Sequence, residues 1–370
     1  MPLPPTWLRR ILLAPLVIVA AVLMLALTPL WLLVGLALTS LVPGRFRLPR
    51  MLWLITVYLL WDAVMVVALF GLWVGSGFGY ALRRPGFVTA HYRLGAWGLR
   101  VLFRIFGSVL RLTISTTGSD DALPDAATGD PAARPIPGAA AGPDAFDALF
   151  APGIPLVVAS RHGGPGDSFI LIHTLLNEAG RRPRIVLKYT LQWDPAIDIL
   201  LHRVPSRFIV PTGFDRAPRG GGMEVERALA QLAEDLGPDD TFVIFPEGGN
   251  VTPSRRLARI KRLRDAGRES LAVRAEALLH VMAPQPGGIH AALDAAPTAD
   301  VVFIAHTGLD RLATLGDIWR ELPMDKGVTM CAWRVPRADV PEGIDARAVW
   351  LFDWFARIDA WIDGHPELGR

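Results

Sequence analysis

Two long apolar runs near the N-terminus constrain the fold of this chain more than any other feature. No charged residue occurs from Ile11 to Val42, and the run from Met51 to Gly79 carries one charge, Asp62. A bilayer has a hydrocarbon core about 30 Å thick, and about 20 apolar residues form a helix that crosses it. Each run is long enough for this, so we predict a helical membrane hairpin over residues 1–80, either spanning the bilayer or re-entering one leaflet.

The first run has features that qualify this prediction. Pro15 and Pro29 lie inside it, which indicates a kink or an end at the membrane interface. Arg9 and Arg10 precede it, as in a signal peptide, but its apolar core is about twice the 7–15 residues of a signal. A second run follows, which favours a retained segment. An acid within such a segment, here Asp62, is functional by default unless it reaches water near an end.

The distribution of arginine predicts the orientation of the hairpin. The segments flanking the hairpin carry more arginine than its turn, so both ends should be cytoplasmic. The lone cysteine, Cys331, excludes an internal disulfide and suits a reducing cytosol. We therefore expect the protein in the cell membrane, the inner membrane of a bacterium, with its active site facing the cytoplasm.

Two segments of different character follow the hairpin. Residues 81–112 contain a basic amphipathic helix whose arginines, at 93, 100, 104 and 111, share one face. It either lies on an anionic membrane surface or packs its apolar side on the soluble domain. Residues 113–150 are rich in Ala, Pro, Gly and Asp without a sustained apolar period. This composition predicts a linker or insertion that carries no chemistry.

Residues 151–370 alternate short apolar runs with helical patterns, which predicts an α/β domain with a largely parallel sheet flanked by helices. The expected strands are Ile154–Ser160, Arg184–Tyr189, Arg207–Val210, Thr241–Phe245, Val301–Ala305 and Val328–Trp333. The expected helices are Ser168–Ala179, Met223–Leu236, Arg255–Asp265 and Asp345–Ile362.

Four polar, glycine-containing segments each follow one of these strands: Arg161–Asp167, Gly213–Arg216, Pro246–Asn250 and His306–Gly308. Ligands of open α/β sheets bind outside the carboxyl ends of the strands. The four segments are therefore expected to meet at one site.

His162 and Asp167 are the candidate catalytic pair. A histidine can remove a proton from a hydroxyl while a carboxylate on its other ring nitrogen fixes its tautomer and orientation. Such a spacing also arises by chance, and Asp167 equally suits the N-cap of a helix that begins at Ser168.

Three further segments have both a functional and an ordinary interpretation. Arg216 can hold a phosphate monoester through its planar donors, or it can form a surface ion pair. Phe245 to Gly249 ends a strand in a turn that would project Glu247 into the crevice, or that leaves a solvated glutamate. A dense basic segment, residues 255–268, can attract phosphates or a membrane surface, or form a solvated helix face.

The order of these parts resembles the glycerolipid acyltransferase family, which includes glycerol-3-phosphate and lysophosphatidate acyltransferases. The resemblance covers roughly Ile154 to Thr307 and rests on His162 with Asp167, Gly213–Arg216, Phe245–Gly248 and Val301–Ala305. It implies the fold of that family, His162 as general base and Asp167 as its orienting partner. It also implies an acceptor site formed by Phe214, Arg216, Pro246, Glu247 and Gly248, in which Arg216 binds the phosphate.

The resemblance further implies a reaction. A fatty acyl group would pass from an acyl thioester, acyl-coenzyme A or acyl carrier protein, to the free hydroxyl of lysophosphatidate, giving phosphatidate in phospholipid synthesis. The expected partners are the lipid bilayer, this lysophospholipid acceptor and the thioester, with no bound cofactor, no metal and no nucleic acid. The alternatives are another lysophospholipid or glycerol-3-phosphate as acceptor, or a non-catalytic membrane lipid-binding protein of the same fold.

The chain departs from the family pattern at two places, and one rival class lacks its motif. Gly249 and Asn250 stand where the family has Thr-Arg, so a basic contact is missing unless Arg255 or Arg256 replaces it. His306 stands where proline is usual. A serine hydrolase would need a Gly-x-Ser-x-Gly elbow, which the sequence lacks, and His162 and Asp167 have no evident third ligand for a metal.

Overall fold

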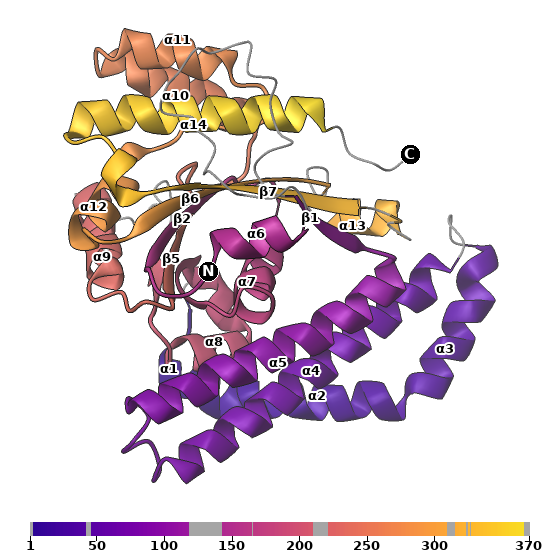
Figure 1. The fold of residues 1–370 in the computed structure, drawn as a ribbon. Coiled ribbons are helices and arrows are strands. Elements are labelled where there is room, and N and C mark those ends of the chain that lie inside the picture. The colour runs from indigo at the N-terminus through magenta and orange to yellow at the C-terminus, as the bar shows by residue number, and fades with distance from the viewer. Residues whose placement is uncertain are drawn as a thin grey trace. The chain divides into compact units, whose positions relative to one another are not determined.

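The structure is a computed structural model that describes residues 3–41, 46–117, 143–164, 166–209, 221–308, 315–322, 325 and 327–365. The chain divides into two compact units, drawn together in Figure 1. The first comprises Met1–Leu112, Leu187–Val210 and Leu315–Asp325. The second comprises Thr113–Val186, Pro211–Thr314 and Lys326–Arg370.

In the first unit, the leading apolar run is a broken helix. It consists of α1 (Thr6–Leu8), a π-helical turn (Arg9–Leu13), α2 (Ala14–Ala26) and α3 (Thr28–Ala37). The break at Leu27 comes just before Pro29, which lies in the first turn of α3. A proline has no backbone N–H and its ring blocks the preceding turn, so the predicted kink is confirmed.

The second apolar run forms α4 (Arg47–Gly75). By length and composition, Thr6–Ala26 and α4 are both able to cross a membrane. This is weak evidence by itself, since a core helix of a soluble protein passes the same test and 44% of the α4 window is buried inside the protein. The helices are consistent with membrane association. Their contacts bear on whether the hairpin spans the bilayer or enters one leaflet.

Helix α5 (Pro85–Leu110) packs its apolar side on α4. The Trp61 indole donates to the Gly98 carbonyl (2.8 Å), and a Cβ at Gly98 would lie 2.7 Å from the Met65 sulfur. Three of the predicted facing arginines, at 93, 100 and 104, are exposed. Helix α5 thus packs on the hairpin, a partner that the sequence did not indicate, and its place on a membrane surface stays a prediction.

Asp62 has a structural partner within the same unit. Its side chain is 2% exposed and accepts a hydrogen bond from the backbone N–H of Ala196 (2.9 Å), in the first turn of α8 (Pro195–Leu201). Asp62 thus reaches neither water nor an open cavity. Instead, this carboxylate fastens α8 to the middle of α4.

The described residues form a sheet of seven strands in the order β1-β7-β6-β2-β5-β3-β4. Strand β2 is parallel to both β5 and β6, β3 is parallel to β5, and β1 is parallel to β7, whereas β6 and β7 are antiparallel. The predicted largely parallel α/β fold is confirmed. The strands are β1 (Thr113–Thr117), β2 (Leu156–Ser160), β3 (Arg182–Lys188), β4 (Ser206–Ile209), β5 (Asp240–Ile244), β6 (Asp300–Thr307) and β7 (Gly327–Val335).

Helices cover both faces of the sheet in the second unit (Figure 1). On one side α14 (Ile344–Gly364), α12 (Pro286–Ala295) and α9 (Gly221–Ala233) bury a core with the inward side chains of β2, β5, β6 and β7. Helices α10 (Pro253–Asp265) and α11 (Glu269–Ala277) pack with Phe352 of α14 in a separate cluster. On the other side lie α6 (Pro143–Leu149) and α7 (Asp167–Asn177).

The prediction of a structureless linker over residues 113–150 was wrong at both ends. Strand β1 pairs in parallel with β7, and α6 precedes the fully buried Phe150. Strand β1 has the sequence TISTT, so its apolar signal is weak and its partner strand supplies its order. The sequence also gave no expectation of α8, α11, α12 or α13 (Leu315–Glu321). Residues 118–142 lie outside the described ranges.

Candidate active site

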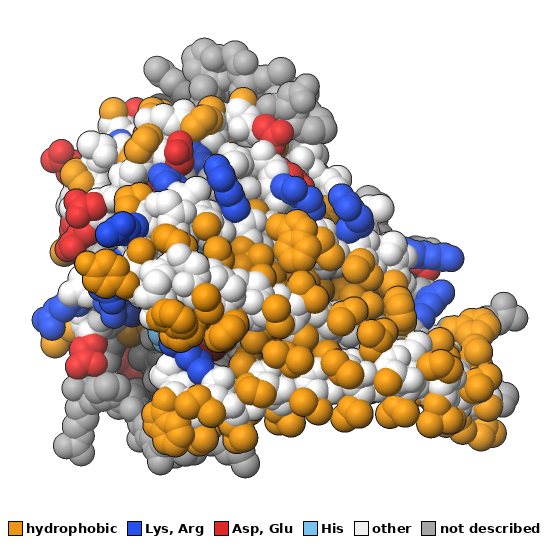
Figure 2. Space-filling model, turned by 90° about the horizontal axis from the view of Figure 1, so that it is seen from below, with side chains coloured by type: hydrophobic (Ala, Val, Ile, Leu, Met, Phe, Trp, Pro, Cys, Tyr) orange, Lys and Arg blue, Asp and Glu red, His pale blue; other side chains and the backbone are white. Residues whose placement is uncertain are grey.

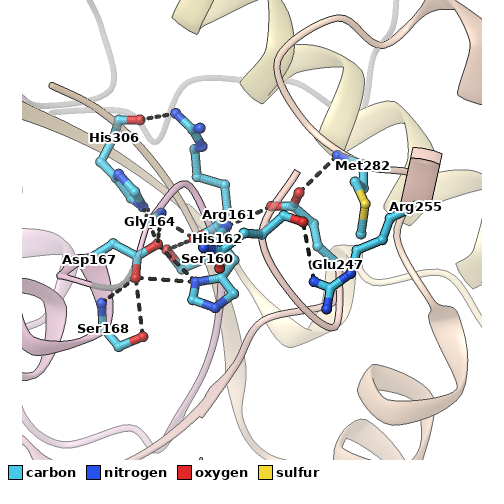
Figure 3. A network of polar contacts seen from close by, with 11 residues as sticks. Ser160, Arg161, His162, Gly164, Asp167, Ser168, Glu247, Arg255, Met282 and His306 are labelled. Atoms are coloured by element: carbon cyan, nitrogen blue, oxygen red, sulfur yellow. Dashed lines mark hydrogen bonds and ion pairs between the residues drawn. The ribbon is translucent and has the colours of Figure 1, made fainter. Parts of the chain in front are cut away.

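Three of the four polar segments meet beyond the carboxyl ends of neighbouring strands. Because β2, β5 and β6 are parallel, His162, Glu247 and His306 emerge at the same edge of the sheet. Figure 3 shows them drawn together from these strand ends. The fourth segment, with Phe214 and Arg216, lies outside the residues that the structure describes.

The pair predicted from the sequence is hydrogen-bonded. His162 Nδ1 lies 2.9 Å from Asp167 Oδ2 and 3.2 Å from Oδ1. The backbone N–H groups of Gly164 (3.1 Å) and Ser168 (2.6 Å) donate to the same carboxylate. The Asp167 side chain is 1% exposed and the His162 side chain 22% exposed. The glycine-rich turn therefore delivers a buried carboxylate to a ring that substrate can still reach.

The surroundings of Asp167 keep it ionised. Burial alone raises the pKa of its carboxyl, but the hydrogen bond from His162 and the electrostatic attraction of the His306 and His162 rings outweigh that effect, so the pKa lies below its usual value. An ionised carboxylate accepts hydrogen bonds and donates none. The proton between the two side chains therefore resides on His162 Nδ1, which leaves a lone pair on Nε2.

Asp167 is the first residue of α7, with Gly166 at the N-cap, so the N-cap expected at Asp167 lies one residue earlier. Its carboxylate is still within the first turn, where the helix N-terminus stabilises negative charge. The structural and the functional interpretations of this residue thus coexist in one position.

Glu247 occupies a different place from the one predicted. Its side chain does not project into the crevice, because the residue is 0% exposed. Oε1 accepts from the backbone N–H of His162 (2.6 Å) and Oε2 from that of Met282 (2.8 Å). Burial raises the pKa of Glu247 to about 7, opposed by these two hydrogen bonds and by the Arg161 and His162 charges. Glu247 therefore fixes the backbone from which the His162 imidazole extends.

The other residues of the Phe245–Gly248 block build the turn. The Phe245 ring packs against the His162 ring, with centroids 4.9 Å apart. The Gln285 backbone N–H donates to the Pro246 carbonyl (2.8 Å), and Gly248 has a φ of +69°, where a side chain would be strained and would overlap Gln285 Nε2. Substrate contacts of Pro246 and Gly248 remain predictions.

The arginines of the basic segment, residues 255–268, make different contacts near this loop. A Cβ at Gly249 would lie 2.5 Å from Arg255 Nη1, so the Arg255 guanidinium rests on the loop at the position where the family's Thr-Arg is missing. Arg256 instead donates to the Glu276 carbonyl of α11 (2.6 Å). Arg259 donates to the Ala283 carbonyl (3.2 Å) and lies half-buried beneath the loop. Of Arg255 and Arg256, the structure places Arg255 against this loop, and its role as a basic contact stays a prediction.

Two residues of this network were not anticipated. Arg161 is 1% exposed and its Nη1 donates to the His306 carbonyl (2.6 Å), while Met282 contributes a backbone N–H. Arginine is rarely buried, and no sequence pattern marks this one. Within the described ranges, no group of three or more His, Cys, Asp or Glu side chains is placed to hold a metal ion.

Comparisons with known proteins bear on the segment that carries this site. Residues 145–307 match the model of a protein family described as Acyltransferase. This segment includes the four sequence blocks and the whole hydrogen-bonded network of Figure 3. The comparisons with curated proteins and with solved structures each gave no match.

Proposed function

Because residues 145–307 belong to the acyltransferase family, as the order of the motifs predicted, we propose that this protein transfers a fatty acyl group from an acyl thioester to the free hydroxyl of lysophosphatidate. The product is phosphatidate. The observation that carries the proposal is the His162 ring, held through Nδ1 by an ionised carboxylate at 2.9 Å and still partly exposed.

The chemistry follows from this tautomer. His162 Nε2 removes the proton of the acceptor hydroxyl as its oxygen attacks the thioester carbonyl carbon. The new C–O ester bond forms and the C–S bond breaks, and the proton held by His162 passes to the departing sulfur as a thiol. Asp167 stabilises the imidazolium formed in between and holds the ring in register. Because the acceptor attacks directly, no acyl-enzyme intermediate is required.

The acceptor assignment is supported by the basic side chains at the edge of the site. A phosphate monoester carries two negative charges that favour planar, multidentate donors such as arginine. Arg255 on the Gly249 loop is one such donor, and Arg216 is a second by the family resemblance. The exposed cations of α10 suit the phosphates of coenzyme A, or of the prosthetic group of acyl carrier protein, by long-range attraction.

The lipid substrate requires access to a membrane, and the first unit has a surface suited to one. Large apolar side chains on α2, α3 and α4 are exposed, among them Leu16, Val19, Leu33, Val67 and Phe70. Figure 2 shows hydrophobic side chains spread over the face formed by these helices, with Lys and Arg side chains along its border. A monomeric soluble protein rarely exposes such a continuous apolar area.

The contacts of α4 favour binding to one leaflet. Arg47 at its beginning donates to the carbonyls of Leu322 (2.9 Å) and Arg320 (2.6 Å). Near its other end the Leu69 carbonyl accepts from Arg203 (2.7 Å). These two points lie about 30 Å apart along the helix, the thickness of a hydrocarbon core.

Helix α8 carries the buried Asp198, which is ion-paired with Arg9 (2.9 Å), and packs along the middle of α4, where Asp62 accepts from its first turn. A spanning α4 would bring this ion pair into lipid. We therefore propose that the hairpin lies in the plane of the cytoplasmic leaflet of the cell membrane, with one face on protein and the other in lipid.

Cysteine labelling tests this membrane arrangement. Cys331 is buried, so background labelling of the wild-type protein should be low. Leu41→Cys at the turn of the hairpin and Tyr80→Cys after it place thiols at exposed positions, 78% and 87% accessible. The two variants are treated with an impermeant maleimide in sealed vesicles of either orientation. We expect both positions to be labelled from the same face of the membrane. Labelling of Leu41→Cys from one face and Tyr80→Cys from the other would establish a spanning hairpin.

The function is tested with purified protein, radiolabelled acyl-coenzyme A or acyl carrier protein thioester, and a panel of acceptors. We expect labelled phosphatidate from lysophosphatidate, and slower reaction with glycerol-3-phosphate or lysophosphatidylcholine. A different preferred acceptor would correct the substrate. Lysolipid binding without any product would instead support the non-catalytic lipid-binding protein, and release of free fatty acid without transfer would support a hydrolase.

A further inference from the structure

A second histidine lies against the catalytic carboxylate. His306 is 4% exposed, near the end of β6, and its Nε2 is 3.7 Å from Asp167 Oδ2. Along β6, Val301, Phe303 and Ala305 point into the core shared with α12 and α14. Side chains alternate along a strand, so His306 points to the opposite face, where Asp167 begins α7. Two imidazoles thus approach the same oxygen of Asp167.

His306 and Arg161 also hold each other. Arg161 Nη1 donates to the His306 carbonyl (2.6 Å), and His306 Nε2 lies 3.2 Å from the Arg161 carbonyl oxygen. The Arg161 backbone N–H in turn donates to the Ile304 carbonyl (3.2 Å). A carbonyl oxygen accepts and never donates, so His306 Nε2 carries a proton directed between the Arg161 carbonyl and the Asp167 carboxylate.

We propose that His306 is a positioning residue for the His162–Asp167 pair, an inference that rests on the proposed acyl transfer. By binding the Arg161 carbonyl, it fixes the backbone that immediately precedes His162. By presenting the same N–H toward Asp167 Oδ2, the oxygen that also binds His162 Nδ1, it gives the carboxylate a second imidazole contact. His306 does not itself touch substrate, since it is 4% exposed whereas the His162 side chain is 22% exposed.

This arrangement has a distinct kinetic consequence. Glu247 and His306 constrain the same short segment from two strands, β5 and β6, through the His162 N–H and the Arg161 carbonyl. Misplacing a catalytic group by about 1 Å costs of the order of 100-fold in rate. Loss of His306 should therefore lower kcat, whereas the acceptor's KM should change little because the basic side chains of the acceptor site lie on other loops.

The test compares His306→Phe, which removes the donor, with His306→Gln, whose amide N–H can reach the Arg161 carbonyl. We expect His306→Phe to lower kcat about 10- to 100-fold with KM within twofold, and His306→Gln to retain kcat within about threefold of wild type. His290→Phe is the matched control, since this histidine is also buried in the second unit, on α12. It should leave kcat within twofold.

Three results would overturn the inference. The first is wild-type kcat in His306→Phe, and the second is no advantage of His306→Gln over His306→Phe. If His306→Phe does not fold, His306→Asn replaces it, because the shorter amide does not reach the Arg161 carbonyl. The third result is then an equal kcat for the Asn and Gln variants. Wild-type protein without transfer activity would overturn the proposed function and this inference together, whereas transfer that is indifferent to residue 306 overturns the inference alone.

Discussion

The loops that follow β2 and β5 each contribute one buried carboxylate to His162, and the two carboxylates do different work. Asp167, from the β2 loop, binds the ring at Nδ1 (2.9 Å). Glu247, from the β5 loop, binds the backbone N–H of the same residue (2.6 Å). One carboxylate sets the tautomer of the His162 ring, and the other fixes the position of the His162 backbone.

Their protonation differs accordingly. Asp167 faces imidazole groups and has a lowered pKa, whereas Glu247 is more deeply buried, has neutral backbone partners, and has a pKa raised to about 7. Burial favours the neutral acid in both cases. At Asp167 the hydrogen bond from His162 and the nearby imidazoles outweigh burial, whereas at Glu247 the backbone hydrogen bonds and the attraction of Arg161 and His162 do not. The contrast shows that a carboxylate's chemical role depends on its partners more than on its distance from the base.

The largest expected effect comes from Asp167→Asn. The amide keeps the shape of the side chain but removes the charge that holds the Nδ1 tautomer, so we expect kcat to fall about 10²- to 10⁴-fold. Steady-state kinetics with acyl-coenzyme A and lysophosphatidate measure this. A kcat within threefold of wild type would show that Asp167 does not orient the base.

Glu247→Ala should act mainly on stability. It leaves the N–H groups of His162 and Met282 buried without their acceptor, and each such group costs about 1–3 kcal/mol. We expect the free energy of unfolding, from urea titration in detergent, to fall by about 2–5 kcal/mol, with kcat reduced as well. If Glu247→Ala kept the wild-type free energy of unfolding but had a reduced kcat, Glu247 would have a catalytic role and not a structural one.

The pH dependence of stability should have opposite signs for the two carboxylates. The raised pKa of Glu247 means that the folded protein binds a proton between pH 4.5 and about 7 that the unfolded chain has released. Stability therefore falls as pH rises through that window, by an amount of the order of 3 kcal/mol. Asp167, with its lowered pKa, stabilises the fold above the usual aspartate pKa and loses this contribution as pH falls through the lowered value.

Unfolding of wild type and Glu247→Gln between pH 4.5 and 8 measures the Glu247 effect. The glutamine cannot ionise, so its stability should fall less over the same window. Parallel curves for the two proteins would show that Glu247 does not titrate there.

The smallest effect should come from the outer side of the β5 loop. Arg255→Gln removes the guanidinium that rests on Gly249, and we expect the KM for lysophosphatidate to rise about 3- to 10-fold with kcat nearly unchanged. Arg256→Gln is the matched control, because Arg256 is bound to α11. Equal effects of the two substitutions would point to general electrostatics and not to a specific contact.

Much of the second unit was predictable because its signals are local. Buried parallel strands are short apolar runs, and the polar segments after β2, β5 and β6 converge because parallel strands end at one edge. Strand β1 was missed because its TISTT sequence carries little apolar signal and gains its order from pairing with β7.

The inward position of Glu247 and the burial of Arg161 depend on contacts between residues distant in sequence, such as Glu247 with Met282. No pattern of neighbouring residues encodes them. The same holds for Asp62, whose partner at Ala196 lies far along the chain.

The central claim is that His162 is the base for acyl transfer, and its most direct test is the rate of labelled phosphatidate formation by His162→Ala. The variant should fold and bind vesicles as wild type does, since its backbone N–H still donates to Glu247. The account predicts a fall in kcat of at least about 10³-fold. Transfer at the wild-type rate by the folded, membrane-bound variant would contradict it.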